Sequence, residues 1–161
     1  MDRSIPTAAD LFSNTRRFHD AYHTIMRPLC IEAQLPPMAI DILMFLANNP
    51  GLDTASDICR CRGLKPGIVS FHVDRLVSDG LLERKSVTGD RRKTLLVLTP
   101  KADWIIKKGH SLQQQFSQEL TRGLSEADLT HLKACIAVFD RNIDRIRSGA
   151  QPEEQQTEEP K

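Results

Sequence analysis

Residues 64–99, LKPGIVSFHVDRLVSDGLLERKSVTGDRRKTLLVLT, decide the fold of this chain. In the first part of this stretch, apolar side chains recur at helical spacing and define a face that packs: Val69, His72, Val73, Leu76 and Val77. The other side of the same helix carries Gly67, Phe71, Asp74 and Ser78, with Ser70 and Arg75 at its flanks. The pattern predicts an amphipathic helix with one buried face and one face open to a partner.

A hairpin is predicted directly after this helix. Asp79-Gly80 favours a tight turn, and Gly89-Asp90 separates two segments, the second of them rich in β-branched and leucine residues. Arg91, Arg92 and Lys93 cluster at the expected tip. A helix, a turn and a hairpin with a basic tip are typical of a winged helix-turn-helix, in which the helix enters the DNA major groove and the wing reaches the neighbouring minor groove or backbone.

The charge distribution points to the same region. The 161 residues carry a net charge of only +1, but residues 55–101 contain ten basic and five acidic side chains. The segments before and after it are each slightly acidic. A local excess of positive charge on a near-neutral protein is typical of phosphate contact, because each neutralised phosphate releases counterions.

The remainder of the chain is predicted to be helical, which gives a mainly α (α+β) fold. A long first helix ends at Pro36-Pro37, and a second runs from about Met38 to Ala47. Thr54 or one of its neighbours is placed to cap a short third helix that Gly63 closes. Thr99 and Pro100 are expected to cap and open a fifth helix that reaches about Arg122. Ser125 and Asp128 form a capping-box-like start for the last helix.

The last helix has an apolar seam at alternating intervals of three and four residues, which is a heptad pattern: Leu129, Leu132, Ile136, Phe139, Ile143 and Ile146. Such a seam requires a partner helix. We expect the partner to be a second subunit, since two-fold proteins match two-fold operators. The alternative is a three-helix layer within one chain.

These elements predict one domain over residues 1–147. The DNA-binding lobe spans about residues 37–99, and dimerisation helices span about residues 8–34 and 100–147. Residues 148–161 are predicted to be a disordered acidic tail. No apolar run approaches membrane-spanning length and the N-terminus lacks the apolar core of a secretion signal, so we expect a cytoplasmic protein with reduced cysteines and no membrane partner.

The sequence resembles the MarR family of bacterial transcriptional regulators from about residue 9 to residue 147. The resemblance is carried by Leu35-Pro36, Ile42-Leu43, VSFHVDRL at 69–76, GLLER at 80–84, DRR at 90–92 and LTPKA at 98–102. It implies a homodimer that binds a pseudo-palindromic operator, usually as a repressor. Such proteins release the operator when a small ligand, metal or oxidant acts near the junction of the dimerisation helices and the winged helix.

The chain departs from the family pattern in its recognition helix. Pro66-Gly67 replace the usual small polar residues, Phe71 stands where Arg or Thr is common, and His72 takes a usually aliphatic position. Phe71 cannot hydrogen-bond a base edge but can contact a thymine methyl group. His72 is predicted to be a satisfied core histidine rather than a DNA ligand.

The expected partner is double-stranded DNA. The side chains predicted to contact it are Lys65, Gly67, Ser70, Phe71, Arg75, Arg91, Arg92 and Lys93. Asp90 is expected to support the wing by pairing with an arginine, since phosphate repels a carboxylate. Arg60 and Arg62 are either further backbone contacts or solvated surface.

A small amphipathic or aromatic effector is the default prediction for regulation. Its candidate pocket residues are Phe18, Tyr22, Met26, Phe45 and Trp104, for each of which core packing is the alternative. Arg16 or Arg17 is expected to pair with an acidic ligand. A zinc-responsive alternative draws on ligands of the types that zinc prefers: His19, His23, Cys30, Asp41 and His110. A redox alternative uses the Cys30 thiol.

Two other classes of function are an enzyme and a protein-interaction module. No nucleophile–base spacing, phosphate-binding loop or metal-hydrolase motif occurs, so neither an enzyme nor a cofactor is predicted. A winged helix that binds only proteins is the remaining alternative. It would not require the basic wing.

Overall fold

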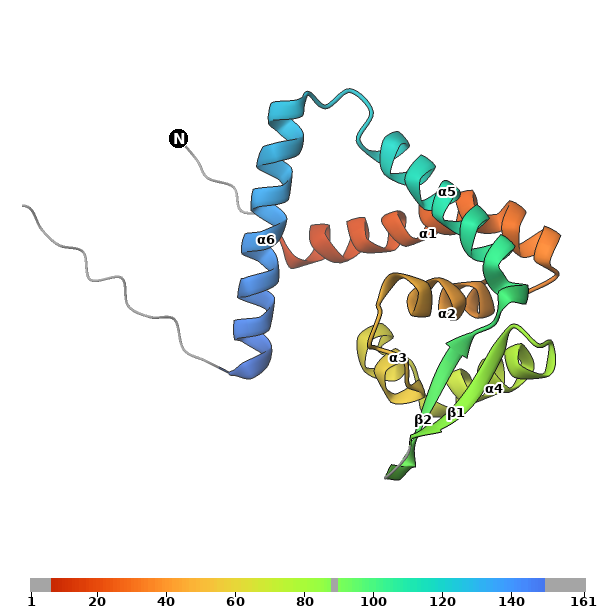
Figure 1. Ribbon diagram of the computed structural model, residues 1–161. Helices are drawn as coiled ribbons and strands as arrows, with labels where there is room; N and C mark the ends of the chain where they lie inside the picture. Colours follow the sequence, from red (N-terminus) through yellow and green to blue (C-terminus); the bar gives the residue numbers. More distant parts are fainter. Residues whose placement is uncertain (1–6, 88–89, 150–161) are drawn as a thin grey trace, which may run out of the picture. The chain divides into compact units, whose positions relative to one another are not determined.

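The computed structural model describes residues 7–87 and 90–149, as a mainly helical chain with a two-stranded wing (Figure 1). The elements in chain order are α1 (Ala8–Ala33), α2 (Pro37–Asn48), α3 (Ala55–Arg62), α4 (Pro66–Ser78), β1 (Leu82–Val87), β2 (Asp90–Leu98), a 3₁₀ turn (Pro100–Ala102), α5 (Asp103–Leu120) and α6 (Glu126–Ser148). The predicted winged helix-turn-helix with N- and C-terminal helices is confirmed.

The short polar residues at the helix ends act largely as the sequence predicts. Thr54 and Asp57 form a capping box at the start of α3, and Ser125 and Asp128 form one at the start of α6. Gly63 ends α3 in the left-handed conformation, with φ 63°, which a residue with a Cβ adopts only at a cost.

The start of the fifth helix differs from the prediction. The Thr99 side chain caps no helix, because its hydroxyl donates to the Gly80 carbonyl oxygen at 2.7 Å. A 3₁₀ turn over Pro100–Ala102 precedes α5. Thr99 therefore fastens the end of the hairpin to the turn that follows α4.

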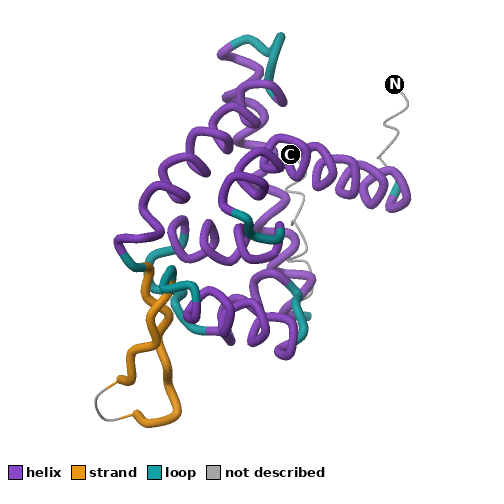
Figure 2. The backbone as a smooth tube through the Cα atoms, turned by 90° about the vertical axis from the view of Figure 1, so that its right-hand side faces the viewer, coloured by secondary structure: helices purple, strands orange, loops and turns teal. Residues whose placement is uncertain are grey.

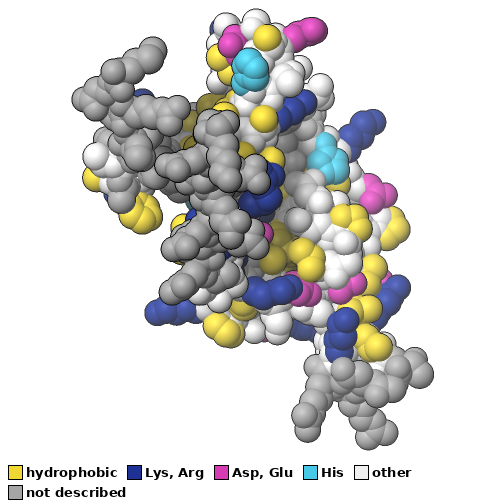
Figure 3. Space-filling view, turned by 90° about the vertical axis from the view of Figure 1, so that its left-hand side faces the viewer, with side chains coloured by type: hydrophobic (Ala, Val, Ile, Leu, Met, Phe, Trp, Pro, Cys, Tyr) yellow, Lys and Arg dark blue, Asp and Glu magenta, His cyan; other side chains and the backbone are white. Residues whose placement is uncertain are grey.

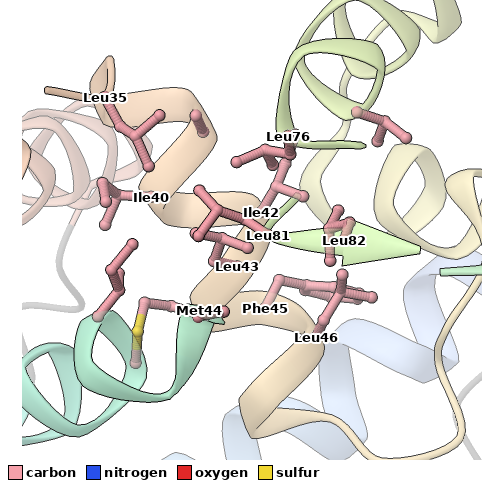
Figure 4. Packing of buried hydrophobic residues seen from close by; sticks show 14 of the residues in the cluster. Leu35, Ile40, Ile42, Leu43, Met44, Phe45, Leu46, Leu76, Leu81 and Leu82 are labelled. Carbon is pink, nitrogen blue, oxygen red and sulfur yellow. The ribbon is translucent and has the colours of Figure 1, made fainter. Parts of the chain in front are cut away.

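The core is built around α2, which is apolar on nearly all sides and contributes seven buried residues. Figure 4 shows Ile42, Leu43 and Phe45 among Leu76 of α4 and the residues that open the hairpin. Leu29 of α1 and Ile105 of α5 are also buried in this cluster. Helices α1 and α4 and the hairpin thus share one core.

The hairpin is antiparallel, with Leu82 opposite Leu98 at its base and Val87 opposite Asp90 at its far end. Figure 2 shows it extending away from the helices. The base is fixed to the core, since Leu82 and Leu96 are buried and the Leu96 N–H donates to the Asp53 carbonyl at 2.7 Å. The predicted turn residue Gly89 lies outside the described residues, whereas Asp90 opens β2.

The chain divides into two compact units, Met1–Glu119 and Leu120–Lys161. In the second unit α6 has no buried residue, and its seam is open. Phe139, for example, is 60% exposed. Almost all of the predicted acidic tail, residues 150–161, lies outside the described residues.

Among the described residues, no single helix is both long and apolar enough to cross a membrane. Phe12–Ala33 and Pro37–Asn48 meet the length and composition criteria only as a pair bent by 101°.

Two helical glycines give a matched test of the packing between α2 and α5. A Cβ on Gly109 would clash with Sδ of the fully buried Met44, whereas a Cβ on Gly67 would meet nothing within 4 Å. We expect Gly109→Ala to lower the free energy of unfolding by about 1 kcal/mol or more, since Met44 must repack. Gly67→Ala should raise it by up to about 1 kcal/mol through helix propensity. Chemical denaturation of both variants checks the pair, and a stabilised Gly109→Ala protein would contradict the packing.

Candidate nucleic-acid interface

Helix α4 separates its side chains into the two predicted faces. Val69, Val73 and Leu76 are buried, while Phe71 is 65% exposed and Ser70 is also open to solvent. Gly67 and Lys65, at the start of the helix, are exposed as well. The predicted division into a packing face and an open face is confirmed.

The position of α4 is fixed by its neighbours. The helix packs against α2, α3 and β1. Beyond these apolar contacts, Arg75 donates from Nη2 to the Gln34 carbonyl at 3.3 Å, and its Nε lies 3.7 Å from Oδ2 of Asp79. Arg75 is therefore partly engaged in holding α4 to the end of α1, a role that the sequence did not suggest.

A second polar contact ties α4 to the wing. Asp74, on the open face, accepts a hydrogen bond from Arg84 of β1, and both side chains are largely exposed. Arg84 was not among the predicted interface residues. Its position in the strand, two residues after the buried Leu82, is the only sequence signal that could have indicated it.

The wing carries further cations. Lys93 of β2 and Lys85 of β1 are exposed. The backbone of Asp90, Arg91 and Arg92 forms the start of β2, while their side chains lie outside the described part of the chain. The supporting role predicted for Asp90 stays a prediction.

The arginines of α3 are held by nearby carboxylates. Arg60 donates to Asp57 at 2.7 Å, on its own helix. Arg62 lies 3.3 Å from Oδ1 of Asp41 on α2, and its guanidinium carbon is 5.3 Å from the centre of the Phe45 ring. Arg62 therefore connects α3 with α2 instead of extending freely from the surface.

His72 corrects the expectation of a satisfied core histidine. The residue is only half-buried, and its buried Nδ1 atom has no hydrogen-bond partner within the part of the chain that the structure describes. Burial lowers the pKa of His72, and the nearby charge of Arg75 lowers it further. The ring meets Phe71 edge-on, with centres 5.2 Å apart and planes at 81°.

A hollow of about 420 Å³ opens within the first unit, between residues of α1, α2, α3 and α5. Phe116 meets both Phe18 and Tyr22 edge-on, with ring centres 5.0 and 5.3 Å apart. Arg62 and Asp41 also line it. It is thus an aromatic cleft with an ion pair in its wall.

A chain of hydrogen bonds orders the polar side of this hollow. Gln113 donates to the Tyr22 hydroxyl oxygen at 2.8 Å, and Asn48 donates to Gln113 at 3.1 Å. The Oδ1 of that Asn48 lies 2.9 Å from Nε2 of His110, which as the partner of an acceptor carries the proton. Burial raises the pKa of Tyr22, so its hydroxyl keeps a proton that it can donate to a ligand.

The structure assembles only part of the predicted effector set. Phe18 and Tyr22 line the hollow, but Phe45 is buried in the core and Trp104 lines a separate hollow beside Arg75. Met26 borders a much smaller cavity than the one above. Arg16 is exposed near Asp20 on its own helix.

The side chains that replace the missing members come from distant parts of the sequence. They are Arg62, Gln113 and Phe116, from α3 and α5. No local pattern indicates that these helices meet α1.

The structure does not bring the five residues of the zinc alternative together. The His19 and His23 rings are neighbours, with centres 4.4 Å apart, but in the described part of the chain no three His, Cys, Asp or Glu side chains gather as metal ligands. His110 is engaged with Asn48. The thiol alternative is also unsupported, because burial raises the pKa of Cys30 and so disfavours the reactive thiolate.

Comparisons with known proteins agree with this geometry. The sequence profile described as "MarR family" matches residues 33–93. The HTH-type transcriptional regulator BilQ of Clostridium symbiosum is 26% identical over 104 residues, which cover 63% of this chain and 72% of that protein.

Two solved structures share the fold. A putative MarR family transcriptional regulator from Listeria monocytogenes, in complex with a 26mer DNA, superposes with a TM-score of 0.69 at 15% identity, over 91% of this chain and 97% of that one. Bordetella bronchiseptica BpsR, whose DNA binding is regulated by 6-hydroxynicotinic acid, superposes with a TM-score of 0.62 at 19% identity, over 81% and 98%.

The open face of α4, the basic hairpin and the shared core define a winged helix-turn-helix DNA-binding protein. The profile match over residues 33–93 identifies this winged-helix part of the chain as that of a MarR family transcriptional regulator. Members of this family are regulators and not enzymes, in agreement with the prediction from the sequence.

Proposed function

We propose that the protein is a homodimeric repressor that binds a pseudo-palindromic operator and leaves it when a small aromatic acid binds. The observation that carries the proposal is the open face of α4 beside a basic hairpin, both fixed to one core. Each α4 enters a major groove, and each wing reaches the adjacent minor groove or backbone. The complex of the Listeria protein with DNA supports this use of the fold.

The wing supplies the electrostatic part of binding. Lys93 and Lys85 are exposed, and Arg91 and Arg92 open the same strand. Cations here would neutralise phosphates or enter the narrow groove, where the negative potential is deepest.

The dimer forms through the apolar seam of α6, whose members after the half-buried Leu129 are open to solvent in the single chain. Figure 3 shows, on the face it presents, hydrophobic side chains at the surface between lysines and arginines. Covering such a seam with its copy removes apolar surface from water and so stabilises a dimer.

The effector occupies the hollow of about 420 Å³. Phe18, Tyr22 and Phe116 suit an aromatic ring, while Arg62 and the Tyr22 hydroxyl suit an acidic group. An anion that draws Arg62 away from Asp41 would disturb the link between α2 and α3, and α3 packs on α4. The regulation of BpsR by 6-hydroxynicotinic acid supports a small aromatic acid as the effector class.

The effector must bind the released form of the protein more tightly than the DNA-bound form, because only a difference in affinity shifts the equilibrium between them. A hundredfold preference supplies about 2.7 kcal/mol per site, enough to empty an operator held at modest excess over its Kd.

Truncating the wing tests DNA docking. Arg91→Ala and Arg92→Ala should each weaken operator binding by about 1–3 kcal/mol. Each should also reduce the slope of log K against log salt by about two, since a dimer loses two phosphate contacts. Fluorescence anisotropy over a salt series measures both quantities. Lys107→Ala, on the exposed side of α5, is the control and should change neither. Unchanged affinity in both wing variants would rule the wing out.

A charge placed in the seam tests the dimer. Ile136→Asp should weaken self-association by about 100-fold or more, because a dimer would bury two unpaired carboxylates. Ala134→Asp puts the same charge on the opposite side of α6 and should have little effect. Sedimentation equilibrium measures both. Equal association of the two variants would show that the seam is not the interface.

Arginine substitutions on α3 test the effector site. Arg62→Ala should raise the concentration of aromatic acid needed for half-release of the operator by about tenfold or more, through loss of a charge-assisted hydrogen bond. Arg60→Ala, two residues away and bound to Asp57, is the matched control. Titration of preformed complexes with a panel of aromatic acids and phenols measures release. Equal sensitivity of the two variants would contradict the site.

A further inference from the structure

The N-terminal half of α4 exposes two large apolar side chains. Ile68 is 43% exposed and Phe71 is 65% exposed. Residues three apart are neighbours on a helix surface, so the two form one apolar patch. Phe71 lies near the middle of the open face, opposite the buried Val69, Val73 and Leu76.

The polar side chains of the same helix are largely engaged elsewhere. Asp74 is paired with Arg84, and Arg75 holds the Gln34 carbonyl and Asp79. Among the open positions 67, 68, 70 and 71, only Ser70 has a hydrogen-bonding side chain. The part of a recognition helix that reaches base edges is its N-terminal part, and here that part is mainly apolar.

Contact with His72 restrains the Phe71 ring. The two rings meet edge-on at 5.2 Å, and His72 is half-buried with its Nδ1 atom enclosed. An edge-to-face pair stabilises one ring orientation. The patch is thus preorganised rather than a freely moving side chain.

The surroundings indicate a polyanionic partner for this patch. Lys65 is exposed at the start of α4, and Lys85 and Lys93 are exposed on the wing. Residues 55–101 carry ten basic and five acidic side chains. A protein partner with an apolar groove would not require this flanking charge, whereas DNA does.

We infer that α4 reads thymine methyl groups in the major groove through Ile68 and Phe71. This rests on the proposed docking of α4 in that groove. The thymine C5-methyl is the apolar group by which the major-groove edge of an A·T pair differs from that of a G·C pair. Residues three apart are separated by about 4.5 Å along a helix axis, close to one base step of about 3.4 Å, so the methyl groups belong to neighbouring base pairs.

The test uses thymine analogues in the operator. The operator is first selected from a random DNA library with the full-length protein. Each thymine of one half-site is then replaced by deoxyuridine, which removes the methyl group and leaves the base-pairing edge intact. At one or two neighbouring positions the affinity should fall about fourfold per methyl group, the value of one buried methyl. Other positions should be unaffected.

Variants assign the effect to the two side chains. In Phe71→Ala or Ile68→Ala, replacing thymine by deoxyuridine at the corresponding position should no longer lower the affinity. The variant should then bind the two operators almost equally. Ile31→Ala, which truncates an exposed apolar residue of α1, should keep the full loss. The wild-type comparison of thymine with uracil needs no variant, so it stands even if one of these proteins folds poorly.

A charge reversal at Lys65 separates this inference from the proposed docking. If thymine and uracil operators bind equally at every position while Lys65→Glu weakens binding, α4 docks without reading methyl groups and the inference is overturned. If Lys65→Glu also has no effect, the docking of α4 fails and the inference fails with it.

Discussion

The burial of one face of α4 against α2 is the constraint on which the rest of the structure depends. Val69, Val73 and Leu76 are fully buried in the core that α2 dominates. Because a helix has a fixed period, burying these three positions forces Phe71 and its neighbours outward. The same core holds the base of the hairpin through Leu82 and Leu96. The reading helix and the wing are therefore presented as one rigid surface.

Periodicity and capping made the fold predictable from the sequence. The apolar spacing of α4, the Thr54 capping box and the left-handed Gly63 are local features, and each indicates an element or its end without reference to the rest of the chain. The prediction that Thr99 caps a helix failed because its hydroxyl makes a non-local hydrogen bond. The bond is to the Gly80 carbonyl, 19 residues away, which no local pattern identifies.

The candidate DNA-contacting surface was more predictable than the proposed effector cleft. The open helix face and the basic hairpin each consist of residues that are close together in the sequence, so their patterns can be recognised locally. The cleft instead combines α1 with side chains of α3 and α5, so Arg62, Gln113 and Phe116 could not be found from spacing. Aromatic residues on the correct helices, such as Trp104, turned out to line another hollow. The histidines and cysteine of the zinc alternative were similarly compatible with a site in sequence but not assembled in space.

The ion pair of Arg62 with Asp41 links these two regions. It joins the wall of the cleft to α3, and α3 packs on the reading helix. Such a surface-accessible pair contributes little to stability, so a ligand can replace it at low cost. Under the proposed regulation, a weak ion pair suits this position better than a strong one, because the DNA-bound and released forms then differ by only a few kcal/mol.

Photocrosslinking tests the central claim, that α4 and the wing form the DNA-binding surface. Operators carrying 5-iodouracil at single positions would be irradiated in complex with the full-length protein, and the crosslinked peptides identified by mass spectrometry. We predict that bases at the centre of each half-site crosslink to residues 65–75, and that flanking bases crosslink to residues 85–93. Crosslinks confined to α1, α5 or α6 would contradict the account.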